Sequence, residues 1–304
     1  MVYMLKFINK LKRYFNKVIF RTPGVEFLQK NKDIKTRTKY LNFWFNKVKN
    51  KKNFKRFFLD SDLPLDELPI RFIQDENYTI SENMLNSLAL NGVIVIENAL
   101  PKNEFLNIKD YFEDLKSGRY KKDWENKPDN PLFFTQADEV RGLIDIQNFS
   151  SLKRYSDYIS KKIYGKSVKP TVEFHYLNIR DKVEEVTRGA TYLHSDRFLP
   201  HFKIFYTPNK IERDTAPFQY SLGSHKLNSK YFNFFKNAEN YDETDKFSKD
   251  LLGKLETITT EENTMYIAFT NGLHKRTCFT EKNKERSMVF LQYVERYNKF
   301  NYLF

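Results

Sequence analysis

The sequence predicts a mainly β (α+β) fold with flanking helices, and three observations support this. Short apolar runs recur through the second half of the chain, and the run at 171–180 has the period-two alternation of a half-buried strand. They lie at 171–180, 191–194, 202–207, 217–222, 254–260, 264–270 and 286–295. Helical patterns precede them, and two histidines suited to one site, His194 and His274, stand 80 residues apart. A double-stranded β-helix (jelly roll, cupin-like) fits all three, because it brings distant strands side by side.

The chain begins with a strongly basic arm. Residues 1–58 carry 17 lysines and arginines against two acidic residues, a net charge of +15, whereas the remainder carries 35 basic and 37 acidic residues. Three interpretations of the arm stay open. Its apolar side chains can pack on the β domain, it can lie in the plane of an anionic membrane surface, or it can bind nucleic acid, the least favoured of the three.

Two helices are expected in this arm. Residues 4–21 place their apolar side chains within an arc of about 140°, with lysines and arginines opposite. Pro23-Gly24 would end that helix. A second helical pattern covers about 36–58, and the acidic, proline-containing stretch 60–69 predicts a linker.

We therefore assign residues 1–70 to the arm and linker, and residues 71–304 to the β-helix domain. Helices are predicted at 80–90, 104–116 and 152–164, and a polar, helix-forming insertion at 227–253. Asn91-Gly92 predicts a turn into the buried strand that follows it.

One cysteine, Cys278, excludes an intrachain disulfide and is typical of a reducing, cytoplasmic compartment. No apolar run approaches the roughly 20 residues of a membrane span, and no signal peptide is recognisable at the N-terminus. We expect a cytoplasmic protein, with peripheral contact to the inner face of a membrane if the arm binds lipid.

His194-Ser195-Asp196 is the stretch that points to chemistry. On an extended strand, residues i and i+2 share a face, so the imidazole and the carboxylate would project together. They supply two ligands of a 2-His-1-carboxylate triad, which holds Fe(II) and leaves positions open for other ligands. His274, after the apolar run 264–270, is the expected third ligand.

Arg286 follows His274 by twelve residues and opens the last predicted strand. A guanidinium there can bind a carboxylate through two hydrogen bonds. Zinc fits the same three ligands, but a zinc site gives no reason for this arginine. The other histidines are expected to be structural or at the pocket rim (His175, His201) or in a turn (His225).

The ordered set of motifs resembles the phytanoyl-CoA dioxygenase-like family. It comprises H-x-D at 194–196, Asp214-Thr215-Ala216-Pro217-Phe218, Gly223-Ser224-His225-Lys226, the late His274 and Arg286. The resemblance runs from about residue 88 to about residue 293. It departs from the family pattern in the short segment after Asp196 and in Ser221-Leu222 before Gly223.

The resemblance implies an Fe(II)/2-oxoglutarate-dependent dioxygenase that also uses O₂. His194, Asp196 and His274 would hold iron, Arg286 would bind the far carboxylate of 2-oxoglutarate, and Tyr206 would donate a hydrogen bond to it. Related halogenases replace the carboxylate ligand with a small residue, so Asp196 favours hydroxylation. The substrate would be a small molecule, a lipid or a glycan (glycolipid). The alternative is a catalytically silent β-helix protein whose basic arm binds an anionic membrane surface or nucleic acid.

Overall fold

The computed structural model describes residues 33–49, 52–59, 68–116, 137–144, 149–179, 191–196, 200–237, 252–281 and 284–293. The helix predicted at 4–21 lies outside these ranges, as does the part of the predicted insertion between 238 and 251.

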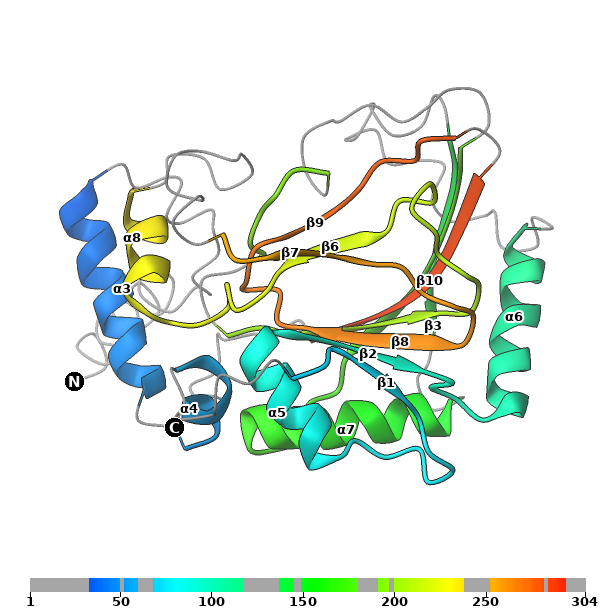
Figure 1. The fold of residues 1–304 in the computed structure, drawn as a ribbon, viewed down its shortest axis with the longest axis horizontal. Coiled ribbons are helices and arrows are strands. Elements are labelled where there is room, and N and C mark those ends of the chain that lie inside the picture. The colour runs from blue at the N-terminus through cyan, green and yellow to red at the C-terminus, as the bar shows by residue number, and fades with distance from the viewer. Residues whose placement is uncertain are drawn as a thin grey trace, which may run out of the picture.

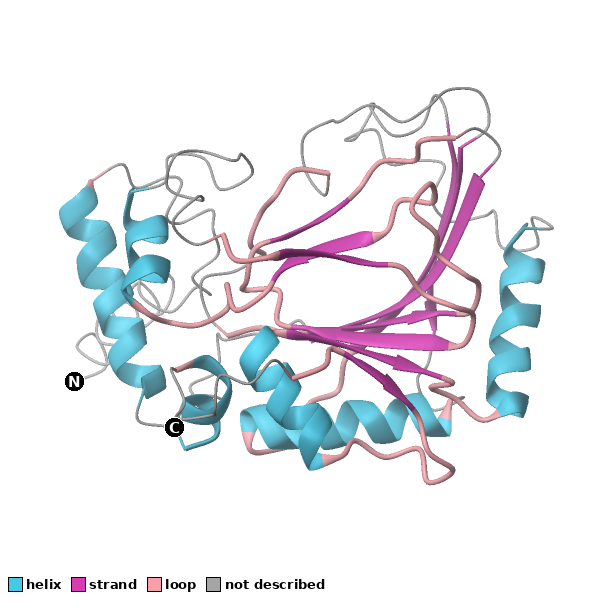
Figure 2. Cartoon of the chain, viewed as in Figure 1, coloured by secondary structure: helices cyan, strands magenta, loops and turns pink. Residues whose placement is uncertain are grey.

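The described strands form two sheets that face each other (Figures 1 and 2). The large sheet has the order β1-β2-β8-β5-β10-β4-β3 and the small sheet the order β7-β6-β9. All neighbouring strands are antiparallel except β1 and β2. The strands of the large sheet are β1 (Arg71–Ile73), β2 (Val93–Glu97), β3 (Ala137–Ile144), β4 (Thr171–Ile179), β5 (Lys203–Thr207), β8 (Thr264–Ala268) and β10 (Lys284–Gln292). Those of the small sheet are β6 (Phe218–Ser221), β7 (Leu255–Ile258) and β9 (His274–Arg276). The mainly β, jelly-roll prediction is confirmed.

Helices cover the outer face and the ends of the large sheet (Figure 2). They are α3 (Ile34–Lys49), α4 (Lys52–Phe58), α5 (Glu82–Asn91), α6 (Lys102–Lys116), α7 (Ser150–Tyr164) and α8 (Ser229–Asn237). In Figure 1, α5 and α7 lie beneath the sheet, while α3 and α8 lie together at one end. None of the described helices combines the length and the apolar composition that crossing a bilayer would require.

Alternation along the strands divides the core into two layers. Side chains of one parity pack between the large sheet and the helices, among them Ile94, Ile96, Ile204, Met265, Ile267, Val289 and Leu291. Side chains of the other parity pack between the two sheets, among them Val93, Val95, Phe205, Tyr266, Ala268 and Met288. Since successive side chains on a strand point to opposite faces, one register decides which residues line the space between the sheets.

The described half of the arm packs on the domain. Phe57 and Phe58 of α4 and Leu41 of α3 are buried in the helix-covered layer. The rings of Phe58 and Phe269 lie 4.5 Å apart, and the imidazole of His225 donates to the carbonyl of Phe57. These buried side chains of α3 and α4 therefore belong to the same hydrophobic cluster as the strands and helices after residue 70. The division of the chain at residue 70 stays a prediction.

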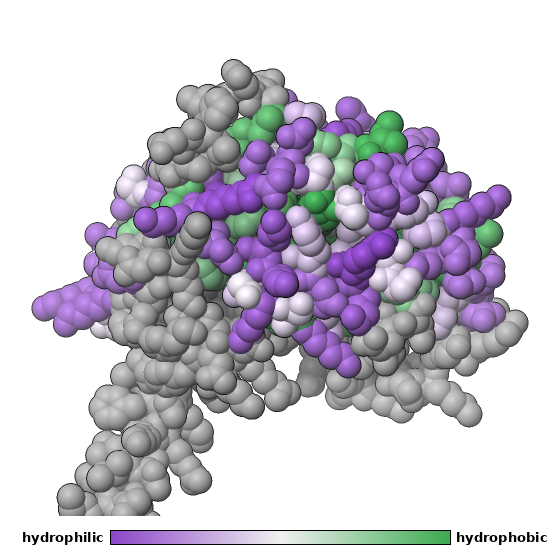
Figure 3. All heavy atoms as spheres, turned by 90° about the horizontal axis from the view of Figure 1, so that it is seen from below, coloured by the Kyte–Doolittle hydropathy of each residue, from purple (hydrophilic) through white to green (hydrophobic). Residues whose placement is uncertain are grey.

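The face beneath the sheet is mostly hydrophilic where it is described (Figure 3). Apolar side chains appear there scattered rather than gathered into one patch. Leu41 of α3 and Phe54, Phe57 and Phe58 of α4 are buried inside the molecule, whereas Ile34 at the start of α3 is exposed.

Some strands were missed or shortened by the sequence analysis. β1 and β9 have three residues each, too few for alternation to be recognised, and β3 is rich in polar and charged residues. The strand predicted at 191–194 is reduced to one β-bridge, between His194 and His274.

Gly92 is the single residue between α5 and β2. Its backbone φ of +82° is left-handed, and its amide donates to the carbonyl of Leu88, as in a helix C-cap. A Cβ added here would collide with Nδ1 of His225 and with the hydroxyl of Tyr220. The site thus needs glycine both for its backbone conformation and for the close approach of these side chains.

We expect Gly92→Ala to lower the free energy of unfolding by about 3 kcal/mol, from a left-handed backbone cost of about 1 kcal/mol and overpacking of about 1–3 kcal/mol. Gly223→Ala is the matched control. Its φ is +75°, but an added Cβ would meet nothing within 4 Å, so its cost should be about 1 kcal/mol. Urea denaturation of the full chain measures both, and equal losses for the two variants would contradict the packing argument.

Candidate functional site

Backbone hydrogen bonds join the 194–196 segment to the first residue of β9 and to the turn before it. The amide of His194 donates to the carbonyl of His274 at 2.9 Å, and the amide of His274 donates back at 2.8 Å. The amide of Asp196 donates to the carbonyl of Thr270 at 2.9 Å. Three side chains from two distant segments are therefore placed by main-chain geometry, before any ligand contributes.

Asn271 fixes the turn from the other side. Its carbonyl accepts the hydroxyl of Ser195 at 2.8 Å, and its side-chain amide donates to the carbonyl of His225 at 3.0 Å. Asn271 and His225 are both fully buried. Buried hydrogen bonds of this kind hold one conformation, because an unpaired polar group there would be costly.

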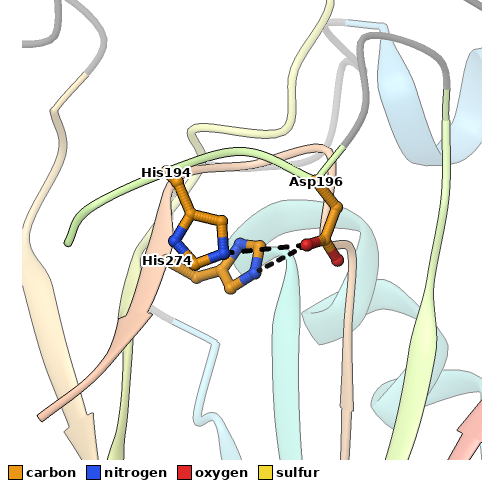
Figure 4. Close-up of side chains that lie close together, drawn as sticks. All are labelled: His194, Asp196 and His274. Carbon is orange, nitrogen blue, oxygen red and sulfur yellow. Dashed lines mark ion pairs between the residues drawn. The ribbon is translucent and has the colours of Figure 1, made fainter. Parts of the chain in front are cut away.

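His194, Asp196 and His274 meet at one point (Figure 4). Oδ1 of Asp196 lies 3.7 Å from Nε2 of His194 and 3.7 Å from Nε2 of His274. The two imidazole rings lie 4.5 Å apart, and one ligand atom from each residue falls within 4.8 Å of the others. The structure brings together the three residues that the sequence analysis selected.

The opposite nitrogen of each imidazole is held by a backbone carbonyl. Nδ1 of His194 lies 2.7 Å from the carbonyl oxygen of Tyr192, and Nδ1 of His274 lies 2.9 Å from that of Gly272. A carbonyl only accepts, so each Nδ1 carries the proton and each Nε2 presents its lone pair to the centre. This is the arrangement that metal-binding histidines adopt.

Lys203 of β5 holds the other oxygen of the carboxylate, with Nζ 2.8 Å from Oδ2 of Asp196. Burial raises the pKa of Asp196, but the positive charge of Lys203 and the adjacent imidazoles outweigh it and hold that pKa well below its usual range. The carboxylate is therefore ionised, with Oδ2 engaged by lysine and Oδ1 directed at the histidines.

The two imidazoles respond differently to the same surroundings. Burial lowers the pKa of His194, but the adjacent Asp196 carboxylate outweighs it and raises the pKa overall. Burial and the charge of His194 together lower the pKa of His274, although Asp196 opposes them. His274 is thus held neutral, which is the form that binds a metal ion.

Two imidazole nitrogens and one carboxylate oxygen form a donor set suited to a divalent transition metal. Three protein ligands leave coordination positions for other molecules, whereas a structural zinc site is closed by four. The donors, their tautomers and the ionised carboxylate all fit such an ion.

A cavity of about 250 Å³ opens beside the triad between the two sheets. Its described lining comprises Glu173, His175, Leu177, His194, Asp196, Lys203, Phe205, Phe218, His274, Arg276, Arg286, Phe290 and Gln292. Arg286 is only 6% exposed and pairs with Leu177 across the β10–β4 ladder. The predicted guanidinium therefore lies in the wall of the same cavity as the triad.

Tyr206 is not part of this cavity. It is fully buried in the helix-covered layer, and its hydroxyl donates to Oδ1 of Asn263 at 3.0 Å. On β5 the residues that face the cavity are Lys203 and Phe205, one step out of register with Tyr206. Contrary to the expectation from the sequence, Tyr206 therefore does not line the cavity where a co-substrate would bind, and its hydroxyl instead bonds Asn263 in the core.

Several lining residues were missed or given no role by the sequence analysis, namely Lys203, Arg276, Glu173 and Gln292. The signal was present for those on the long strands. Once Arg286 is placed inward on β10, period-two alternation directs Gln292 inward as well. Arg276 stands two residues after His274 and shares its face for the same reason.

Of the remaining histidines, one lines the cavity and two hold the fold through hydrogen bonds. His175 of β4 lines the cavity. His201 is buried and lies within hydrogen-bonding distance of the Thr270 hydroxyl and of the carbonyl of Tyr293. His225 bonds the carbonyls of Phe57 and Ala89 through Nε2. His201 and His225 are thus structural.

No family model matches the chain, and no curated protein matches it. The expected membership of the phytanoyl-CoA dioxygenase-like family stays a prediction.

Solved structures resemble the chain path of this protein. EctD from S. alaskensis, in its apo form, has a TM-score of 0.49 and 15% identity, covering 75% of this chain and 81% of its own. AviO1 from Streptomyces viridochromogenes Tue57 has a TM-score of 0.47 and 15% identity, covering 68% and 91%. HygX from Streptomyces hygroscopicus, with nickel and 2-oxoglutarate bound, has a TM-score of 0.44 and 11% identity, covering 70% and 86%. At these values the likeness carries no argument about the reaction of this chain.

We expect wild-type protein to bind one Co(II) ion per chain, and Asp196→Ala to weaken that binding by more than about 100-fold, since it removes a ligand and not merely an outer partner. Asp214→Ala is the matched control, because Asp214 also forms a lysine ion pair, with Lys284 at 2.7 Å, away from the cavity lining. Calorimetric titration under anaerobic conditions measures both. Equal Co(II) affinity in the two variants would show that Asp196 is not a ligand of the metal ion.

Proposed function

We propose that this chain is an Fe(II)/2-oxoglutarate-dependent dioxygenase that hydroxylates a small molecule. The observation that carries the proposal is the meeting of His194, Asp196 and His274 in the wall of a cavity that also holds the buried guanidinium of Arg286. In the balanced reaction, one oxygen atom of O₂ enters the substrate as a hydroxyl group. The other enters succinate as 2-oxoglutarate loses CO₂.

The three triad residues would hold the iron, and the iron with 2-oxoglutarate and O₂ supplies the oxidising chemistry. Arg286 would bind the carboxylate of 2-oxoglutarate that is remote from the keto group, because a guanidinium and a carboxylate pair through two hydrogen bonds. A zinc centre acting on water would have no use for this buried arginine. The retained carboxylate of Asp196 favours hydroxylation over halogenation.

The chain's other residues shape the reaction space. Lys203 keeps Oδ2 of Asp196 occupied, so only Oδ1 is directed toward the two imidazoles. The rings of Phe205, Phe218 and Phe290 line the cavity, and Phe218 lies 5.4 Å from the ring of His274. These apolar walls would reduce the number of water molecules beside a bound metal ion, which would strengthen the electrostatic interactions there.

Anaerobic loading with Fe(II), followed by 2-oxoglutarate and air, tests the reaction without knowledge of the substrate. We expect slow succinate release that requires Fe(II). Arg286→Lys should raise the KM for 2-oxoglutarate by about tenfold or more, because a charge-assisted hydrogen bond contributes about 1.5–3 kcal/mol.

Tyr206→Phe is the control in that assay. It removes one buried hydrogen bond, to Asn263, and should cost about 1 kcal/mol of stability with no change in KM. If wild-type protein binds no iron and releases no succinate, the chain is instead the catalytically silent protein, and the enzyme proposal fails.

The arm bears on where the enzyme works. Since Leu41, Phe54, Phe57 and Phe58 are buried in the core, the membrane contact that we propose for the arm rests on residues 1–32, which carry the basic amphipathic pattern. Such an arm would bring a cytoplasmic oxygenase to the inner face of a membrane, where substrates with an apolar body gather.

Deleting residues 1–32 is therefore expected to abolish co-sedimentation with vesicles that contain anionic lipid. Binding of the full chain should fall steeply with salt, because it depends on exposed lysines and arginines. Fe(II)-dependent succinate release should be unchanged in the truncated protein. Equal vesicle binding by the two proteins would refute the role of the arm.

A further inference from the structure

We propose that Arg276 binds a single carboxylate on the molecule that is oxidised, so that the substrate is a small organic acid with an apolar body. This inference rests on the proposed function, because it assumes that Arg286 is taken by 2-oxoglutarate. It assigns a role to a second buried arginine that the iron and the co-substrate do not use.

Arg276 is built into the cavity wall next to the triad. It stands two residues after His274 on β9, so the two side chains share a face of the small sheet. It is 8% exposed, lies opposite Phe218 in the β6–β9 ladder, and its Nη1 donates to the carbonyl of Thr277 at 3.2 Å. A guanidinium held in this way has a defined direction.

The two arginines enter the cavity from different sheets. Arg286 lies on β10 of the large sheet, whereas Arg276 lies on β9 of the small sheet, the strand that also carries His274. One guanidinium suffices for the remote carboxylate of 2-oxoglutarate. Arg276 is thus positioned for a different carboxylate, on the side of the cavity that belongs to the small sheet.

Charge balance favours one negative charge on the substrate. The described lining carries three cationic side chains, Lys203, Arg276 and Arg286, and two carboxylates, Glu173 and Asp196. Fe(II) and the dianion of 2-oxoglutarate cancel each other. The charged side chains of the described lining then sum to one positive charge, and a half-buried positive charge favours an anionic substrate over a neutral one.

The apolar part of the lining indicates the rest of the substrate. Phe205 and Phe218 lie 5.3 Å apart, and Phe205 and Phe290 lie 5.4 Å apart, so their rings form a continuous apolar wall. Phe218 connects this wall to Arg276 through the strand pairing and to His274 through ring contact. A substrate anchored by its carboxylate at Arg276 would lay its apolar body along these rings, near the metal ligands.

Calorimetry of the Zn(II)-loaded protein with saturating 2-oxoglutarate tests this without turnover. The probes are acids and their neutral amides, phenylacetate with phenylacetamide and hexanoate with hexanamide, together with phenyl phosphate. We expect at least one acid to bind at least tenfold more tightly than its amide and more tightly than phenyl phosphate. Arg276→Gln should remove that preference, and Arg276→Lys, which keeps the charge, should retain part of it.

Lys275→Gln is the matched control, since Lys275 is the neighbour on the same strand and points to the other face. It should preserve the acid preference. In Arg276→Gln the affinity for 2-oxoglutarate should stay within twofold of wild type, while Arg286→Gln should lose at least tenfold.

Three results would overturn the inference while leaving the proposed function in place. They are equal binding of acids and amides by wild type, tighter binding of phenyl phosphate, and a loss of 2-oxoglutarate affinity in Arg276→Gln as large as in Arg286→Gln. Failure of the wild-type protein to bind Zn(II) or 2-oxoglutarate would instead refute the proposed function itself.

Discussion

The reciprocal backbone hydrogen bonds between His194 and His274 are the constraint on which the site depends. They close a loop of 80 residues and set two imidazoles 4.5 Å apart, ring to ring. The amide of Asp196, bonded to Thr270, carries the carboxylate to the same point. Because these are main-chain hydrogen bonds, the three donors are arranged by folding and not by the ligand. The conformational entropy of the three donors is therefore lost when the chain folds, and binding of a metal ion does not have to supply that free energy.

A second constraint is the register of the long strands. On β5 and β10 one parity packs against helices, and the other faces the cavity with charged and aromatic side chains. A shift of one residue would exchange Tyr206 for Lys203 and Phe205 at the cavity wall and would place a lysine in the apolar layer. The same alternation that builds the hydrophobic core thus also selects the residues that meet a ligand.

Much of the triad could be predicted from the sequence, because H-x-D needs only local strand geometry and the late histidine followed an apolar run. The fold class was predictable from the recurrence of short strands. Tyr206 was misplaced because its register was fixed by packing against Asn263 and the helices, which no local pattern reveals. Lys203 was missed because its partner, Asp196, is a neighbour only after β5 has paired with β8 and β10. The sequence left open whether α4 packs on the domain, because its basic residues resemble those of a surface arm. In the structure its Phe57 and Phe58 are buried.

Long-range ¹H–¹⁵N NMR of the histidine side chains tests the central claim most directly, since it reports the protonated nitrogen of each ring. In metal-free protein at pH 8, His194 and His274 should both be protonated at Nδ1, as their contacts with the carbonyls of Tyr192 and Gly272 require. Adding Zn(II) should shift Nε2 of both rings and leave the tautomers unchanged. Protonation at Nε2, or resonances that do not respond to Zn(II), would contradict a preformed metal site.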